Sequence, residues 1–151
     1  MRTIAISRDD GGLSIMNLID DAADIGAEVA RWAAGTGISA TAWEDITGRP
    51  LPAREFRGAW VISGGNINVS MSQARDIHLA RIRAARDSKL KDSDSEQLRL
   101  LDVGTPPQKA AHAAFRQALR DLPANITGSL MSAQTPEELS AVWPAEIERP
   151  E

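Results

Sequence analysis

The chain has 151 residues, enough for one ordinary domain or two very small ones. Its 17 basic and 21 acidic residues give a formal charge of -4, which argues against a protein that mainly coats nucleic acid, because such surfaces are usually basic. The absence of cysteine excludes a disulfide scaffold, a zinc–thiolate site and a thiol nucleophile.

The start of the chain has the pattern of a β-hairpin. Two short apolar runs, at residues 3–6 and 13–16, flank the sequence Asp9-Asp10-Gly11-Gly12. Aspartate and glycine favour the backbone conformations that tight turns require. We therefore predict two antiparallel strands joined by this turn.

A helix is expected next, from about residue 21 to residue 34. Ile25, Val29 and Trp32 recur at spacings of four and three, so they would share one face of this helix. Gly35 is placed to end it. The acidic residues that would suit the positive end of the helix dipole are Asp20, Asp21 and Asp24.

The remaining elements before residue 71 are expected to be short. Clusters of Gly, Pro and Asn separate them, and two large aromatic residues lie four positions apart in one of them. They are an extended segment at 38–46, a turn at 47–50, a short helix or bent strand at 56–62, a turn at 64–66 and a strand at 67–70.

The composition changes at Ser70, where a helical half of the chain begins. Residues 71–101 contain no Gly or Pro and favour helix throughout, with Asp92-Ser93-Asp94-Ser95 as the point where we expect an interruption. Thr105-Pro106-Pro107-Gln108 has the pattern of a second helix start, with Thr as N-cap and Pro in the first turn. We predict that Leu122-Pro123 ends this second helix.

The predicted fold class is α+β, in two parts. Thr135-Pro136-Glu137-Glu138 starts a short last helix that Pro144 would stop, and the few residues around Gly104 should bring the two long helices together as an antiparallel hairpin. Residues 1–70 would form a small hairpin–helix–strand unit. Residues 71–151 would form the helical hairpin and the last helix.

The seam of this hairpin would be rich in alanine. Burial of one CH2 contributes about 0.8 kcal/mol, so a seam made largely of methyl groups stabilises weakly. We infer that the hairpin needs a partner, either the N-terminal unit or another chain. The apolar stripe of the second helix consists of Ala111, Ala114, Phe115, Ala118 and Leu122.

Residues suited to catalysis or metal binding are few. His78 and His112 have no further ligands at helical spacing, which favours surface or hydrogen-bonded histidines over a pair across the hairpin. The serines lack the context of a nucleophile, and the glycine doublets lack that of a phosphate loop. Adjacent carboxylates are explained by turns and caps, with a glycosidase-like acid–base pair as the weaker alternative. We expect no catalytic residue, no metal, no cofactor and no small-molecule substrate.

A basic run and four tryptophans complete the distinctive features. Six Lys and Arg residues lie between Arg75 and Lys91, but no aromatic residue is interleaved to stack a base. A solvated helix face paired with the acidic N-terminal unit is therefore favoured over nucleic-acid binding. Trp32 and Trp60 are expected in the core, whereas Trp43 and Trp143 could be core or interface.

Two stretches resemble proteins of bacteriophage tails. Phe56-Arg57-Gly58-Ala59-Trp60, a turn, Ile67-Asn68-Val69 and the helix start Met71–His78 look like a segment of small tail-region proteins of phages and prophages. Phe115-Arg116-Gln117-Ala118-Leu119-Arg120-Asp121-Leu122-Pro123 resembles the aromatic-R-Q-A-L-R-D-x-P signature of phage tail assembly chaperones and tail-fibre assembly proteins. The resemblance covers roughly residues 54–144.

The resemblance implies a non-enzymatic protein that binds a phage tail or tail-fibre protein and assists its assembly. It would act in the cytoplasm of the bacterial host, since no apolar stretch suits a membrane span or a signal peptide, and it either leaves the particle or stays in the tail of the virion. The alternatives are a structural adaptor of the tail tip or baseplate, and a phage-encoded inhibitor of a host defence complex.

The signature also has a physical reading. Arg116 and Arg120 lie four apart on one helix face, beside an apolar stripe, which suits either the grip of an acidic or aromatic partner or a cap on the hairpin itself. The predicted partner-binding residues are Phe115, Arg116, Leu119, Arg120, Leu122 and Trp143.

Overall fold

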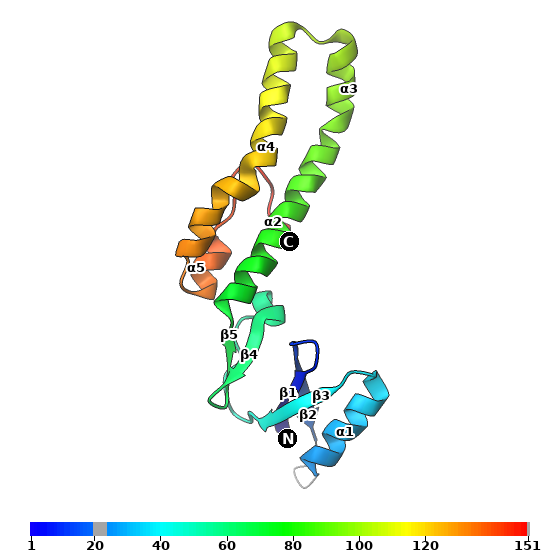
Figure 1. Cartoon of the computed structure of the whole chain (residues 1–151), viewed down its shortest axis with the longest axis vertical. Coiled ribbons are helices and arrows are strands. Elements are labelled where there is room, and N and C mark those ends of the chain that lie inside the picture. The colour runs from blue at the N-terminus through cyan, green and yellow to red at the C-terminus, as the bar shows by residue number, and fades with distance from the viewer. Residues whose placement is uncertain (20–23, 151) are drawn as a thin grey trace. The chain divides into compact units, whose positions relative to one another are not determined.

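The computed structural model describes residues 1–19 and 24–150 (Figure 1). Helix makes up 57% and strand 18% of it, with the strands in the N-terminal half and the long helices in the C-terminal half, so the α+β prediction is confirmed. The chain divides into two compact units, Met1–Ala74 and Arg75–Glu151.

The first unit is built on a three-stranded antiparallel sheet. β1 (Arg2–Arg8) is the central strand, with β2 (Leu13–Leu18) on one side and β3 (Ala40–Asp45) on the other. β1 and β2 form the predicted hairpin, in which Arg2 pairs with Leu18 and Ser7 with Leu13. Gly11 adopts a φ of 78° in the turn, a conformation that favours glycine.

Both faces of the sheet are covered within this unit. Strand side chains alternate between faces, so Ile4 and Ile6 lie on one side of β1 and Ala5 on the other, and all three are buried. Helix α1 (Ile25–Thr36) covers the first face with Ile25 and Val29. Partly buried residues that join this cluster include Trp32.

The boundaries of α1 differ from those predicted. Asp24 is its N-cap and accepts a hydrogen bond from the Ala27 backbone N–H at 3.2 Å, whereas Asp20 and Asp21 lie outside the described residues. Gly35 does not end the helix. The left-handed residue that does so is Gly37, with a φ of 72°, whose N–H donates to the Ala33 carbonyl. The wrong prediction arose because only one of two nearby glycines can take the terminating position.

A small hairpin covers the second face of the sheet. For the segment at 56–62 the sequence predicted either a short helix or a bent strand. The structure has both, because a 3-10 helix η1 (Arg54–Ala59) leads directly into β4 (Trp60–Ser63). β4 pairs with β5 (Asn66–Val69) across the glycine turn. Trp60 and Ile67 form a buried cluster with Ala5 and Ile46, as predicted for Trp60.

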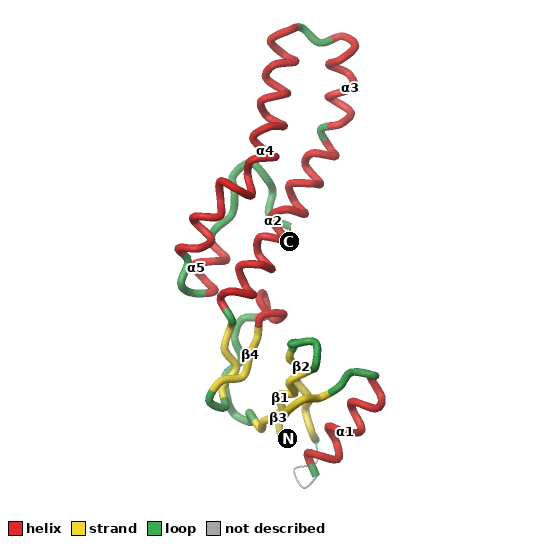
Figure 2. The backbone as a smooth tube through the Cα atoms, in the orientation of Figure 1, coloured by secondary structure: helices red, strands yellow, loops and turns green. Residues whose placement is uncertain are grey.

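The second unit is helical, and Figure 2 shows its long helices running up and back as a hairpin. The predicted interruption separates α2 (Met71–Asp92) from α3 (Asp94–Val103) at Ser93. α4 (Pro106–Ser132) returns antiparallel to them. Its start is as predicted: the Gln108 side-chain oxygen accepts hydrogen bonds from the N–H and the hydroxyl of Thr105.

The predicted end of α4 at Pro123 is wrong, because the helix continues to Ser132. A proline inside a helix removes one backbone hydrogen bond and bends the axis, and the yellow and orange parts of α4 in Figure 1 run in different directions. The Thr127 hydroxyl donates to the Pro123 carbonyl at 2.8 Å. Leu130, beyond the bend, is buried, so continued packing outweighs the local cost of the proline.

The last helix begins as predicted and ends early. α5 (Pro136–Ala141) has Thr135 as N-cap, whose hydroxyl accepts a hydrogen bond from the Glu138 N–H at 3.2 Å. It ends three residues before Pro144, the residue expected to stop it. Leu139 is fully buried, and the segment that follows α5 adds Ile147 to the buried residues of the unit.

Leu119 tests the packing of the helical hairpin. It is fully buried on α4, so Leu119→Ala should lower the free energy of unfolding by about 2–5 kcal/mol. The matched control is Leu101→Ala on α3, where the side chain is 60% exposed and we expect a change within about 0.5 kcal/mol. Urea unfolding followed by the helical circular dichroism signal measures both, and equal effects would contradict this packing.

Asp45 makes the stability of the first unit depend on acid pH. Hydrogen bonds from the Thr47 hydroxyl and backbone N–H, and then from Arg2, lower the pKa of Asp45 to about 2. A carboxylate whose pKa is lower in the folded state contributes stability above its ordinary pKa, which is lost as the pH falls through about 4 to 2. Asp45→Asn should therefore be destabilising at pH 7, and this difference from the wild type should vanish near pH 2.

The measurement is the thermal midpoint of the wild type and of Asp45→Asn across this pH range. Glu44→Gln, which neutralises an exposed carboxylate on the same strand, controls for the loss of one negative charge. A difference between Asp45→Asn and the wild type that persists at pH 2 would argue against this role of Asp45.

Candidate partner-binding surface

The structure separates the predicted partner-binding residues of α4 into two groups. Leu119 and Leu122 are buried in the helical unit. Phe115 is 38% exposed, and its ring lies beside that of His112 with centroids 6.1 Å apart. Arg120 is exposed. Of these four side chains, Phe115 and Arg120 are therefore the ones that a partner could reach directly.

Arg116 is used inside the hairpin. Its guanidinium donates to the Leu90 carbonyl at 3.1 Å, to the Ser93 hydroxyl, and to the Asp94 carboxylate at 2.8 Å. Its side chain is only 15% exposed. A guanidinium with several donors suits the carbonyl groups at a helix end and the carboxylate that follows them. Arg116 thus joins α4 to the junction of α2 and α3.

Trp143, the sixth predicted residue, is held at the other end of the helical unit. Its indole N–H donates to the Ile147 carbonyl at 2.9 Å. Its ring meets the ring of the buried His78 edge-on, with centroids 5.7 Å apart, and the Arg149 guanidinium lies 5.7 Å from its ring centroid. Nε2 of His78 lies 2.8 Å from the Val142 carbonyl oxygen. Trp143 is half-buried and joins α2 to the C-terminal segment.

The two histidines are therefore hydrogen-bonded or packed in different places rather than paired. His78 lies against Val142 and Trp143, and His112 lies against Phe115. Among the residues that the structure describes, no three His, Asp or Glu residues are grouped so that they could hold a metal ion.

The basic run of α2 includes residues with roles inside the unit. Arg75 donates to the carbonyls of Leu130, at 3.0 Å, and Ala133, at 2.7 Å, at the C-terminal end of α4. Arg86 pairs with Asp87 at 2.7 Å. A cation near the last carbonyls of a helix also interacts favourably with its dipole. Arg75, at the C-terminal end of α4, and Arg116, within its N-terminal half, thus link α4 to the helices before it.

A group of exposed apolar side chains lies on α3 and was missed by the sequence reading. Leu98, Leu101 and Val103 are 69%, 60% and 65% exposed, whereas Leu100 between them is buried. Four large apolar residues in six positions surround a helix, and a single neighbouring helix can cover only one side of it. This high density of large apolar residues is the sequence feature from which exposed apolar side chains on α3 could have been predicted. We call the exposed side chains of Leu98, Leu101, Val103 and Phe115 the distal apolar surface; Leu98 and Leu101 share one face of α3, whereas Val103 lies on another.

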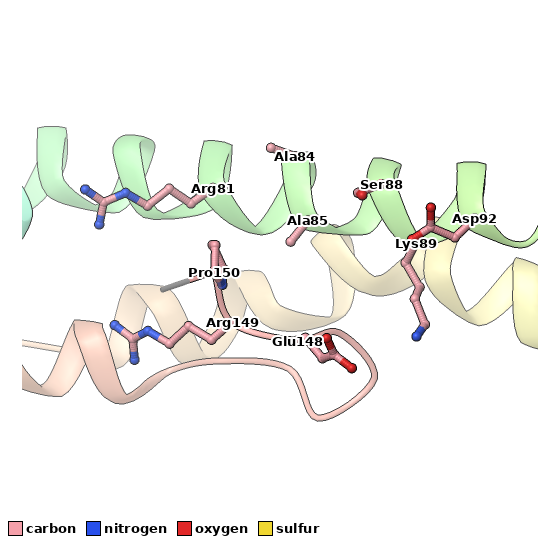
Figure 3. Close-up of a pocket in the computed structure, with 9 residues that line it drawn as sticks. All are labelled: Arg81, Ala84, Ala85, Ser88, Lys89, Asp92, Glu148, Arg149 and Pro150. Carbon is pink, nitrogen blue, oxygen red and sulfur yellow. The ribbon is translucent and has the colours of Figure 1, made fainter.

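A groove lies between α2 and the C-terminal segment of the same unit (Figure 3). Its volume is about 470 Å³, and small side chains, Ala84, Ala85 and Ser88, form its α2 side. Charges of both signs surround it, which gives it no preference for an anion or a cation. The charged residues that line it are Arg81, Lys89, Asp92, Glu148 and Arg149.

The comparisons with known proteins concern this helical unit. Residues 79–150 match the family described as phage tail assembly chaperone protein. This part of the chain is similar to the phage tail assembly chaperone family. The match contains α3, α4, α5 and the distal apolar surface, and it confirms the resemblance predicted from the sequence. The searches of curated proteins and of solved structures found no match to the chain.

The match to this family supports a helper role in tail assembly. A chaperone works by binding another protein, which agrees with the prediction of a non-enzymatic role. No helix formed by residues 1–19 and 24–150 is long and apolar enough to cross a membrane.

Arg116 and Arg120 form a matched pair for testing this division of roles. Arg116→Ala should lower the free energy of unfolding by about 1–3 kcal/mol, because it leaves the partly buried Leu90 carbonyl and Ser93 hydroxyl without this charged donor. Arg120→Ala removes the same charge from an exposed position and should change stability by less than about 0.5 kcal/mol. Urea unfolding compares them, and equal losses would refute the internal role of Arg116.

Proposed function

We propose that this protein is a non-enzymatic chaperone that binds a phage tail or tail-fibre protein through the distal apolar surface. The observation that carries the proposal is the exposure of Leu98, Leu101 and Val103 within the segment that matches the chaperone family. Large apolar side chains exposed together on a protein surface are typical of interaction sites. The host cytoplasm, where tails are assembled, is the compartment that this family implies.

The energetic argument starts from what the hairpin leaves uncovered. Complete burial of a Leu or Val side chain contributes about 1.5–3 kcal/mol, and these side chains are about two-thirds exposed on α3. A partner that covers Leu98, Leu101 and Val103 therefore gains several kcal/mol of apolar contact. This supports a tail polypeptide with an exposed apolar segment as the client.

Two residues of α4 add specificity to this surface. Phe115 offers an aromatic ring at the edge of the hairpin, and aromatic side chains are frequent anchors in interfaces. Arg120 presents a solvated guanidinium that suits a carboxylate of the client. In this proposal Arg116, Leu119, Leu122 and Trp143 act indirectly, because they hold the helices that carry the surface.

Complementation of a phage that lacks this protein tests the proposal. The variant Leu98→Ser/Leu101→Ser removes two exposed apolar side chains, so it should fold but reduce the yield of tailed, infectious particles about tenfold or more. Plaque counts and electron microscopy of particles measure the yield. Ile19→Ser is the matched control: its side chain is 91% exposed in the other unit, and it should complement as well as the wild type.

Co-expression with the tail-fibre protein and mass spectrometry separate the finer claims. If the chain is an assembly factor for the fibre, omitting it from the co-expression lowers the soluble yield of fibre protein. Mass spectrometry of purified particles then finds little of the chain. A stoichiometric copy in purified particles would instead identify a component of the tail. Full complementation by Leu98→Ser/Leu101→Ser, with the variant folded, would rule out the distal apolar surface as the binding site.

A further inference from the structure

A second site lies in the first unit, outside the segment that matches the chaperone family. A pocket of about 250 Å³ opens between the sheet and the segment that leads into β4. Three arginines line it, Arg49, Arg54 and Arg57, together with polar Thr3 and Asn17. Among the described residues that line the pocket, none carries a carboxylate.

This concentration of positive charge contrasts with the rest of the unit. The chain as a whole carries a formal charge of -4, and several other arginines of this unit are neutralised by carboxylates. These ion pairs are Arg2–Asp45, Arg8–Asp10 and Arg31–Glu28. Three guanidinium groups around one pocket without a lining carboxylate therefore produce a local positive potential in an acidic protein.

Trp60 places a buried indole in the wall of this pocket. It lines the same pocket and is 3% exposed, and its buried indole Nε1 has no hydrogen-bond partner among the described residues. Buried polar groups almost always have a partner, so an unpaired indole N–H calls for an explanation. The Arg57 guanidinium lies 5.8 Å from the centroid of the Trp60 ring, which places a cation beside this donor.

We propose that this pocket binds an oxyanion, a phosphate or a carboxylate group, with Arg54 and Arg57 as the principal charged donors. Guanidinium groups form bidentate, charge-assisted hydrogen bonds with such groups. Arg49 has a second role, because it also donates to the Asn66 side chain at 3.0 Å and so connects the pocket to β5. The apolar lining residues Ile15 and Leu51 suit an aliphatic part of a ligand that carries the oxyanion.

The pocket size is consistent with this class of ligand. A water molecule takes up about 30 Å³ in the liquid, so a pocket of about 250 Å³ has room for an oxyanion and part of its hydration or of an attached chain. The site is open to solvent and its arginines are exposed, so binding should weaken as salt is added.

Nuclear magnetic resonance of the indole N–H groups tests the site in the full chain. The signal of Trp60 is identified by its loss in Trp60→Phe. Potassium phosphate is then titrated at constant ionic strength against potassium chloride, and in a second arm a short amidated peptide that contains Glu and Leu is titrated. We expect a saturable shift of the Trp60 indole signal with at least one of the two probes.

Variants decide whether the arginines are responsible. Arg54→Gln/Arg57→Gln should weaken the binding of the effective probe about tenfold or more. Arg31→Gln, which removes a positive charge elsewhere in the unit, should leave it unchanged. A response to phosphate identifies a free oxyanion as the ligand, and a response to the peptide identifies a carboxylate of a protein segment. No saturable shift with either probe, or an equal response in the double variant, would overturn the site.

Discussion

The constraint on which the helical unit depends is that one helix can cover only one side of its neighbour. α3 carries Leu98, Leu100, Leu101 and Val103, and in a hairpin of two helices only Leu100 finds cover. Where the second unit consists of only two helices, it therefore cannot bury all of its large apolar side chains. The uncovered ones create the distal apolar surface, and the proposed function links this consequence of the packing to the binding of a client.

Polar contacts add to the apolar packing of the helical unit, in which Ala111, Ala114 and Ala118 of the predicted stripe are exposed rather than buried. Arg116 binds the junction of α2 and α3, and Arg75 binds the last carbonyls of α4. His78 and Trp143 connect α2 to the C-terminal segment. Hydrogen bonds to charged groups contribute about 1.5–3 kcal/mol each, comparable to the burial of a large apolar side chain. Such contacts fix the register of the helices while leaving apolar side chains available for a client.

Much of the fold follows from local sequence, because turns and helix caps are determined by a few adjacent residues. The β1–β2 hairpin, the interruption at Ser93 and the capped start at Thr105 were all predictable for this reason. The continuation of α4 through Pro123 was not, because it depends on Leu130 and on Arg75, which is distant in sequence. Local signals identify where a helix can end, whereas tertiary packing decides whether it does.

The candidate site was less predictable for the same reason. Spacing places Arg116 and Arg120 on one face of α4, but it does not say that Arg116 turns into the hairpin while Arg120 remains in solvent. The pocket around Trp60 was missed because its arginines come from a loop and a 3-10 helix without periodicity. Residues that meet only after folding leave no regular pattern in the sequence.

The burial and contacts of its residues show that the signature Phe115–Pro123 serves mainly the structure of the hairpin. Leu119 and Leu122 are buried, Arg116 clamps the hairpin, and Pro123 bends α4, so most of the signature specifies how the hairpin is built. The side chains left exposed for a partner include Phe115, Arg120 and Leu98 and Leu101 of α3. Most of the signature thus describes the scaffold of the hairpin. Under the proposed function, the residues that characterise the family and most of those that bind the client are therefore different residues of the same hairpin.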